Sequence, residues 1–279
     1  MKDLEFFCVE IDHYTSEVPN HIMPRSNAPD MENQILRLFG NTAEGCSLCV
    51  HVHNYNPYFY IQVPQNSNMK VTEADLPNVK HNLASVLPSN CKEGIRSLTI
   101  DKSKRSLMFF TPPEEPQTFI RVEVLENRFV SSIRTHVEKD FTFKGQPFEQ
   151  TTYDFTTPYC TRYMIDHGLN GMSWYRVKEN QFVLRKEDQK VTSCQLEFDV
   201  WAPAAVTMHP QQDKQCGLRI LSFDIECMAE GTKLPVPSKD PVIQISNVIQ
   251  NSLDNKPSNM NVFTLKKTAN IPDAQVFSF

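Results

Sequence analysis

Two acidic residues, Asp224 and Glu226, close a short apolar segment and have the types and spacing that metal-dependent cleavage of phosphodiesters requires. Alternate side chains of a strand share one face and lie about 6.5–7 Å apart, so a strand over residues 218–227 presents both carboxylates together. Two carboxylates placed in this way can bridge and flank a pair of divalent ions about 3.5–4 Å apart. One ion then generates the attacking hydroxide, and the other stabilises the leaving oxygen.

The spacing by itself leaves two interpretations open, a metal-binding pair or the exposed, charged end of a strand. With 15 Asp and 18 Glu among 279 residues, about one Asp-x-Glu is expected by chance. The sequence holds three such pairs, and only the pair at 224 and 226 ends an apolar strand and precedes a second one, over residues 241–249. This context makes it the first candidate for a catalytic and metal-binding site.

The hydrophobic pattern predicts an α+β chain that is rich in strands. Apolar residues recur at helical spacing over residues 72–87 and 126–139. A third helix is expected to begin at Thr157 and Pro158 and to end at Gly168. The predicted strands cover residues 34–39, 46–53, 58–63, 96–101, 106–110, 119–125, 173–177, 181–185, 194–200, 218–227 and 241–249.

The predicted elements suggest two domains. The order strand, helix, two strands, helix over residues 58–139 is most of a split βαβ arrangement, which ferredoxin-like and RRM domains share. The RRM signature with its stacking aromatics is absent, so the arrangement by itself says little about RNA. Residues 203–217 are polar and rich in turn formers. We therefore predict one domain over residues 1–216 and a second over residues 217–279.

Composition excludes several classes of protein. The chain carries 28 Lys and Arg against 33 Asp and Glu, a net charge of −5, whereas a general nucleic-acid coating protein is strongly basic. No apolar run approaches the roughly 18 residues of a membrane span. The eight cysteines are scattered, and we interpret them as reduced thiols of an intracellular protein with no membrane partner.

The run Cys46-x-x-Cys49-x-His51-x-His53 contains residue types that bind zinc. Leu48, Val50 and Val52 alternate with its last three members, which is the pattern of an ordinary half-buried strand. A continuous strand does not make the knuckle turn that tetrahedral ligation requires. The sequence therefore predicts a strand here, without zinc.

Longer strings carry a specific resemblance. The segment Phe223–Cys227, together with Asp240–Ile245, resembles the first exonuclease motif of the family B DNA polymerases, with the replicative eukaryotic members the most similar. Further segments resemble the N-terminal domain of that family, in family order from about residue 34 to the end. They are Arg37–Gly40, Cys49–His53, Pro57–Tyr60, Arg162–Asp166, Ser173–Trp174 and Gln195–Val200.

The resemblance implies that Asp224 and Glu226 supply two carboxylates of a two-metal Mg²⁺ site in a proofreading 3′→5′ exonuclease. The family's later Asn-x-x-x-Phe-Asp and Tyr-x-x-x-Asp motifs, and its nucleotide-addition motifs, do not occur in this sequence. We therefore expect an N-terminal fragment of a replicative DNA-directed DNA polymerase. An N-terminal domain with OB-like and RRM-like elements would precede the opening antiparallel strands of a truncated RNase H-like exonuclease domain. The fragment itself is expected to be inactive.

The resemblance also implies partners and a location. These are the single-stranded template, the primer 3′ end in the parent enzyme, accessory polymerase subunits, a sliding clamp, and the nucleus. Two other interpretations remain open: a stand-alone single-stranded nucleic-acid-binding or scaffolding domain with a non-catalytic acidic pair, and a nuclease that obtains its missing carboxylates elsewhere.

Several residues of the N-terminal domain are candidates for template contacts. Aromatic rings at Tyr55, Tyr58, Phe59 and Tyr60 would stack on bases. Basic residues would meet phosphates, namely Lys102, Lys104, Arg105, Arg185, Lys186 and Lys190. The alternative for the aromatics is an ordinary place in the core, and the alternative for the basic residues is a solvated turn.

Overall fold

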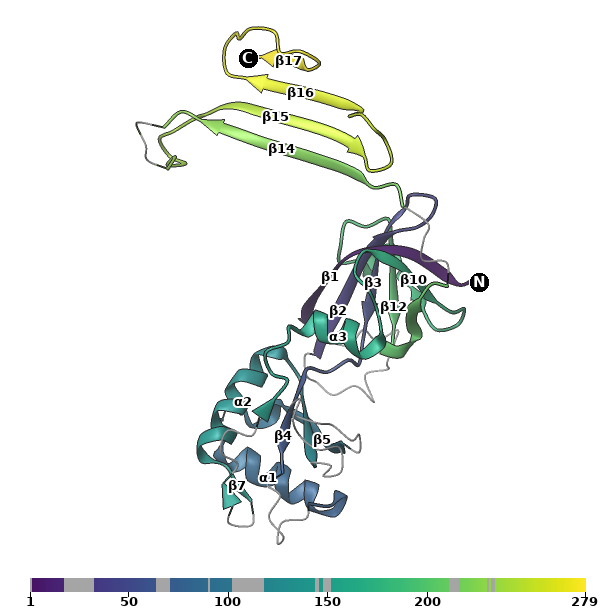
Figure 1. The fold of residues 1–279 in the computed structure, drawn as a ribbon, viewed down its shortest axis with the longest axis vertical. Coiled ribbons are helices and arrows are strands. Elements are labelled where there is room, and N and C mark those ends of the chain that lie inside the picture. Colours follow the sequence, from purple (N-terminus) through teal and green to yellow (C-terminus); the bar gives the residue numbers. More distant parts are fainter. Residues whose placement is uncertain are drawn as a thin grey trace, which may run out of the picture. The chain divides into compact units, whose positions relative to one another are not determined.

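The computed structural model describes residues 2–17, 33–63, 71–89, 91–101, 118–143, 146–147, 152–210, 216–229, 231 and 234–279. The chain divides into two compact units, which are treated separately below (Figure 1). The larger unit comprises Met1–Thr42 with Cys46–Gln212, and the smaller comprises Ala43–Gly45 with Asp213–Phe279. This division lies beside the predicted domain boundary at residue 216. The strand predicted over residues 106–110 lies outside the described residues.

The larger unit contains a seven-stranded sheet with the order β11-β12-β3-β2-β1-β10-β13. Neighbouring strands are antiparallel, except that β12 runs parallel to β3. The predicted hairpin over residues 34–53 is confirmed as β2 and β3. The strands are β1 (Leu4–Ser16), β2 (Asn33–Asn41), β3 (Ser47–Val52), β10 (Ser173–Val177), β11 (Val183–Leu184), β12 (Leu196–Val200) and β13 (Val206–Met208).

No strand is predicted before residue 34, yet β1 lies between β2 and β10 and has 13 residues. Leu4, Phe6 and Cys8 are buried in strict alternation. The pairing register with β2 then shifts between Cys8 and Glu10. A bulge of this kind adds one residue and reverses which positions face inward, so the alternation that reveals a strand is interrupted halfway.

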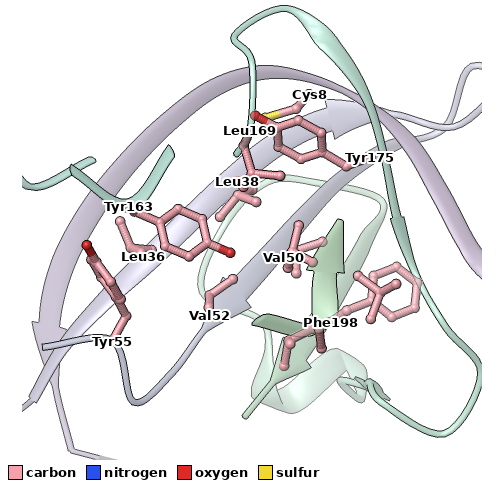
Figure 2. Close-up of a cluster of buried hydrophobic side chains, with 14 of the residues drawn as sticks. Cys8, Leu36, Leu38, Val50, Val52, Tyr55, Tyr163, Leu169, Tyr175 and Phe198 are labelled. Atoms are coloured by element: carbon pink, nitrogen blue, oxygen red, sulfur yellow. The ribbon is translucent and has the colours of Figure 1, made fainter. Parts of the chain in front are cut away.

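One face of this sheet packs an apolar cluster that Figure 2 shows at close range. Leu36 and Leu38 of β2 meet Val50 and Val52 of β3 there. Helix α3 (Tyr159–His167) adds the buried ring of Tyr163. Its predicted end at Gly168 is confirmed. That residue adopts the left-handed conformation with φ 61°, and the N–H of Leu169 donates to the Met164 carbonyl at 2.8 Å.

A second sheet of the larger unit has the order β5-β6-β4-β9 and packs against two helices. Along the chain its elements run β4, α1, β5, β6, α2, β9. Both helices were predicted from the spacing of their apolar residues, and Val79, Leu83, Ile133 and Val137 are buried as that spacing requires. The elements are β4 (Tyr58–Gln62), α1 (Leu76–Val86), β5 (Ile95–Asp101), β6 (Phe119–Val124), α2 (Asn127–Asp140) and β9 (Thr152–Tyr153).

Short elements complete the larger unit. The two-residue strands β7 (Thr142–Phe143) and β8 (Gln146–Pro147) pair with each other. Single-turn 3₁₀ helices are η1 (Glu73–Asp75), η2 (Lys92–Gly94), η3 (Glu187–Gln189) and η4 (Pro203–Ala205). Among the described residues, no helix is long and apolar enough to cross a membrane.

The smaller unit is a four-stranded sheet with the order β14-β15-β16-β17. The predicted strands at 218–227 and 241–249 are confirmed as β14 and β15. The first three strands are antiparallel, as expected, whereas β17 runs parallel to β16. The strands are β14 (Arg219–Cys227), β15 (Val242–Asn251), β16 (Asn259–Thr264) and β17 (Gln275–Ser278).

Candidate functional site

The acidic pair lies on strand β14, where apolar and polar residues alternate. From residue 221 to residue 226 the odd positions are apolar and the even positions are polar or acidic. Alternation of this kind favours a strand with one apolar and one polar face. Asp224 and Glu226 therefore share the polar face, as the sequence predicts for residues two apart on a strand.

The neighbouring strand surrounds the pair with neutral polar residues. In the antiparallel register Asp224 lies opposite Ser246, and Glu226 lies opposite Gln244. Directly opposed residues of a sheet have side chains on the same face. The hydroxyl of Ser246 and the amide of Gln244 therefore lie beside the two carboxylates, and no opposing cation neutralises them across this pair of strands.

β14 is the terminal strand of its sheet, so its outer edge has no neighbouring strand among the described residues. The backbone N–H of Ile225 donates a hydrogen bond to Oδ1 of Asp224 at 2.9 Å. This bond ties one carboxylate oxygen to the strand itself. Both acidic side chains are exposed, so they are accessible to an ion or a substrate from solvent.

The strand changes register immediately after the pair. A bulge lies between Glu226 and Cys227, and the N–H of Met228 then donates to the Pro241 carbonyl at 3.0 Å. Bulges re-aim side chains and end pairing, and they are frequent next to active sites. Glu226 therefore stands at the point where the regular ladder stops.

The donor chemistry of this pair fits a hard divalent cation. Mg²⁺ prefers carboxylate oxygens and is usually held by one or two of them together with substrate phosphates. In the part of the chain that the structure describes, no cluster of three or more His, Cys, Asp or Glu residues is arranged to hold a metal. The carboxylates of Asp224 and Glu226 thus have the chemistry that such an ion prefers, but the pair is fewer than the three groups that a metal cluster would need.

Three tyrosines predicted to stack on bases belong to the hydrophobic core instead. Tyr55, Tyr58 and Tyr60 are only 6%, 5% and 3% exposed. The hydroxyls of Tyr55 and Tyr58 both donate to the carboxylate of Asp166, at 2.7 and 2.8 Å. Burial, followed by these contacts with Asp166, raises the pKa of both hydroxyls. Phe59 is also fully buried, in the cluster that includes residues of α1 and α2, and shares this correction. None of these four rings is available to bases.

Arg185, predicted to meet a phosphate, is also buried. Its guanidinium makes two hydrogen bonds to Asp199, from Nε at 2.8 Å and from an Nη at 2.6 Å. It also lies 3.5 Å from Glu197. Paired hydrogen bonds between a guanidinium and a carboxylate are strong and directional. The prediction for Arg185 is therefore corrected, because its charge is committed to the interior.

The strand predicted over residues 46–53 is confirmed as β3, but it is buried on both faces and not half-buried. The polar face of this strand can be buried because His51 and His53 each have a carboxylate partner on β12. Nε2 of His51 lies 2.9 Å from Glu197, and Nε2 of His53 lies 2.7 Å from Asp199. The other ring nitrogen of His51 contacts the hydroxyl of Tyr14 at 3.2 Å.

Burial influences which side chains of this buried ionic group (His51, His53, Arg185, Glu197 and Asp199) are charged. It lowers the pKa of His51 to about 4, and the nearby Arg185 acts in the same direction. Burial also opposes ionisation of Glu197. The hydrogen bonds that Glu197 accepts from the hydroxyl and N–H of Thr192, from the N–H of Val191 and from His51 outweigh that effect, so its pKa lies below the ordinary value. His51 is accordingly neutral at neutral pH, and Glu197 is ionised.

The remaining basic candidates fall into three groups. Lys186 is exposed, and its predicted phosphate contact stays a prediction. Lys190 is ion-paired to Glu187 at 2.6 Å and also donates to the Gln195 carbonyl at 2.7 Å. The other candidates lie outside the described residues, namely Lys102, Lys104 and Arg105.

The buried ionic group was not anticipated from sequence. A signal did exist: Glu197 and Asp199 occupy alternate positions of a strand, with the same spacing as His51 and His53. Two charged residues on an otherwise apolar strand need partners if both faces are buried. Pairing the strands that carry these residues would have given each of the four side chains a hydrogen-bond partner.

Comparison with known proteins places these features in a family. A model of the DNA polymerase family B exonuclease domain matches residues 150–279. The DNA polymerase delta catalytic subunit of Dictyostelium discoideum is 34% identical over 99% of this chain. The corresponding subunit of Bos taurus is 30% identical over 100% of the chain. The chain spans about a quarter of the length of these relatives, 25% in each case.

A solved structure agrees at the level of fold. The family B DNA polymerase of the hyperthermophilic archaeon Pyrobaculum calidifontis superposes with a TM-score of 0.60 at 22% sequence identity. The match covers 94% of this chain and 27% of that one. The similarity therefore extends through both units and is not restricted to the exonuclease match.

Proposed function

Because this chain belongs to the family B DNA polymerases as an N-terminal region, we propose that it is the template-binding domain and the first exonuclease segment of a delta-type replicative polymerase. The observation that carries the proposal is the position of Asp224 and Glu226. They share one face of an edge strand, are open to solvent, and lie within residues 150–279, which match the exonuclease family.

Asp224 and Glu226 are proposed to hold divalent metal, and exonuclease domains of this family generally depend on such ions. A divalent ion held by these residues would supply an activated water and would stabilise the leaving 3′ oxygen. Asp224 has one oxygen bonded to the N–H of Ile225, which leaves the other free for an ion. Glu226, at the bulge, has a longer side chain and can reach the same ion from the next position on that face.

The larger unit is proposed to bind the template single strand and to support the exonuclease segment. Its β4, α1, β5, β6, α2, β9 order and its β5-β6-β4-β9 sheet agree with a split βαβ, RRM-like element. The seven-stranded sheet would be the OB-like element. Because Tyr55, Tyr58 and Tyr60 are core residues, template contacts must come from other side chains.

The parent enzyme is proposed to act on a primed DNA template in the nucleus, with accessory subunits and a sliding clamp. This part of the proposal rests on the similarity to delta catalytic subunits. A stand-alone nucleic-acid-binding domain with a vestigial acidic pair is less favoured, since the similarity continues through the segment that bears the pair.

Excision by a full-length polymerase that carries this region tests the proposal. The Asp224→Ala/Glu226→Ala variant should lose removal of a mismatched 3′ nucleotide and keep nucleotide addition, because two metal ligands are gone. A matched control is Asp3→Ala/Glu5→Ala, an exposed pair with the same spacing in the larger unit. Excision that survives in the first variant would contradict the assignment.

The 279-residue chain by itself is proposed to be inactive as a nuclease. Two-metal cleavage needs about four carboxylates, and the described residues offer the pair alone. Incubation of a 3′-labelled single strand with Mn²⁺ should leave it intact for both the wild-type chain and the double variant. Cleavage by the wild type that disappears in the variant would show that the pair is competent unaided.

A further inference from the structure

A groove of about 340 Å³ lies in the larger unit, beside the edge strand β11. Its apolar wall includes Trp201 and Phe182, and its polar lining includes Asn180, Gln181 and Asp199. None of these five side chains belongs to the acidic pair on β14. The combination of a planar aromatic surface with amide and carboxylate groups is the chemistry that recognises a planar, hydrogen-bonding ligand.

The aromatic wall is held in place from behind. The ring of Trp201 is half-buried and lies nearly parallel to that of His53, at 23° and 6.1 Å between centroids. His53 is in turn fixed by its 2.7 Å contact with Asp199. Phe182 meets Phe198 edge-on at 5.5 Å. A surface anchored in this way needs no reordering before a ligand stacks on it, which lowers the entropic cost of binding.

The polar side of the groove can form hydrogen bonds with the edge of a planar ligand. Asn180 and Gln181 are exposed, and the turn that presents them is closed by the Gln181 N–H, which donates to the Lys178 carbonyl at 3.1 Å. An amide group both donates and accepts hydrogen bonds.

Charged side chains of both signs surround the groove. Lys178 opens the segment that lines the groove, and Lys186 follows β11 directly; both are exposed. Glu179, Glu187 and Asp188 are exposed as well, so these charges by themselves do not attract a phosphate. This balance suits a ligand held mainly by stacking, with one or two phosphate contacts and a shallow dependence on salt.

We infer that this groove binds one base of a single-stranded nucleic acid, with the base stacked on Trp201, its edge facing the amides of Asn180 and Gln181, and a flanking phosphate near Lys186. The inference rests on the proposed function only in taking DNA as the ligand. It gives the template-binding role a location that the buried tyrosines do not provide.

Tryptophan emission tests the inference directly, since the chain has two tryptophans. Trp174 is only 4% exposed and packs against Phe7 at 5.7 Å between centroids. Titration of the chain with a 16-residue oligothymidylate should quench the emission. The quench should persist in Trp174→Phe, the matched control, and disappear in Trp201→Phe. A quench that persists in Trp201→Phe, or the absence of any quench in the wild type, would overturn the inference.

Variants that should change the binding affinity provide a second test, which does not depend on whether one substituted protein folds. Trp201→Ala should weaken oligothymidylate binding, measured by fluorescence anisotropy, by roughly tenfold or more. Gln181 is exposed, so a charge of either sign can be introduced at this position. Gln181→Lys should strengthen binding and Gln181→Glu should weaken it, each about two- to threefold. If the groove had only a structural role, the two substitutions would not change the affinity in opposite directions. Equal affinities for the two Gln181 variants would therefore contradict the inference.

Two further outcomes separate this inference from the proposed function. Oligothymidylate binding that is unchanged in Trp201→Ala would place the DNA contacts elsewhere and leave the polymerase assignment standing. A chain that binds no oligonucleotide, while an unstructured peptide quenches Trp201, would show that the groove takes a peptide, and the inference would be wrong. The proposed role of the acidic pair is tested separately, by the removal of a mismatched 3′ nucleotide.

Discussion

Strands β12 and β14 each carry a pair of acidic residues at the same spacing, and the surroundings of the two pairs differ completely. On β12, Glu197 and Asp199 are 0% and 2% exposed and are bonded to His51, His53 and Arg185. On β14, Asp224 and Glu226 are exposed and face only the neutral side chains of the neighbouring strand. Neither spacing nor residue type distinguishes the two pairs.

The neighbouring strands account for the difference. β12 pairs with β3 and β11. The partners of its two acids are His51 on β3, His53 just after β3 and Arg185 just after β11. β14 pairs with β15 alone among the described strands. A buried charge is tolerated only when it is paired, whereas a metal ligand must stay unpaired until the ion arrives. The pair on β12 therefore stabilises the fold, and the pair on β14 remains available for chemistry.

The largest expected effect comes from removing one charge of the buried pair. Asp199→Asn leaves the guanidinium of Arg185 buried without its carboxylate, which should lower the free energy of unfolding by about 3–5 kcal/mol. Urea unfolding followed by tryptophan fluorescence measures this, since Trp174 and Trp201 both lie in the larger unit. A loss below about 1 kcal/mol would mean that the buried ion pair contributes little to stability.

The pH dependence of stability should come from the same group. His51 stays neutral in the folded state down to about pH 4, because burial lowers its pKa, whereas an unfolded histidine takes up a proton near pH 6.5. The unfolded state binds more protons between these values, so stability falls as pH falls through that window, by roughly 3 kcal/mol in all. The lowered pKa of Glu197 extends the loss to more acidic pH.

Unfolding curves at pH 7, 5.5 and 4.5 should show this decline for the wild type. The decline should be smaller in His51→Gln, which removes the titrating ring. His81→Gln is the matched control, because His81 is exposed on α1. Identical slopes in His51→Gln and His81→Gln would show that the pH dependence arises elsewhere.

Local patterns in the sequence predicted the elements well where the pattern was continuous. Helices α1 and α2 were anticipated from their apolar spacing, and β14 from its apolar run, because each is encoded within a short window. Strand β1 was missed because the register shift after Cys8 interrupts its alternation. In each case, the success or failure follows from residues close together in sequence.

The burial of Arg185, Tyr55 and Tyr58 depends on contacts between distant segments and could not be predicted in this way. The partner of His51 is 146 positions away, and that of Tyr55 is 111 positions away. A basic residue after a short strand is usually exposed, and tyrosine is intermediate between buried and exposed residue types. Sequence spacing likewise indicated a shared face for Asp224 and Glu226, but not that β14 is an edge strand with Ile225 bonded to Asp224.

A moderate effect is expected for the tyrosine hydroxyls. Tyr58→Phe removes one of the two donors to the Asp166 carboxylate and should cost about 1–2 kcal/mol of stability. The ring stays buried, so oligothymidylate affinity should not change. A Tyr58→Phe variant of normal stability with weakened DNA binding would show that Tyr58 contacts the template.

The smallest effect on stability is expected at the exposed pair. Asp224→Asn/Glu226→Gln removes two charges that face solvent, and the change should stay within about 0.5 kcal/mol. Urea unfolding followed by circular dichroism, which reports on both units, measures it. A loss comparable to that of Asp199→Asn would show that the β14 pair has a structural role and is not a pair of metal ligands.

Metal binding by this same variant tests the central claim most directly, namely that the exposed pair and not the buried pair holds the ion. Mn²⁺ titration of the wild-type chain, followed by electron paramagnetic resonance of the free ion, should reveal weak binding with a Kd on the order of millimolar, as expected for two carboxylates. Binding should be lost in Asp224→Asn/Glu226→Gln and kept in the control Asp3→Asn/Glu5→Gln. Unchanged Mn²⁺ binding in the first variant would contradict the assignment of the site to β14.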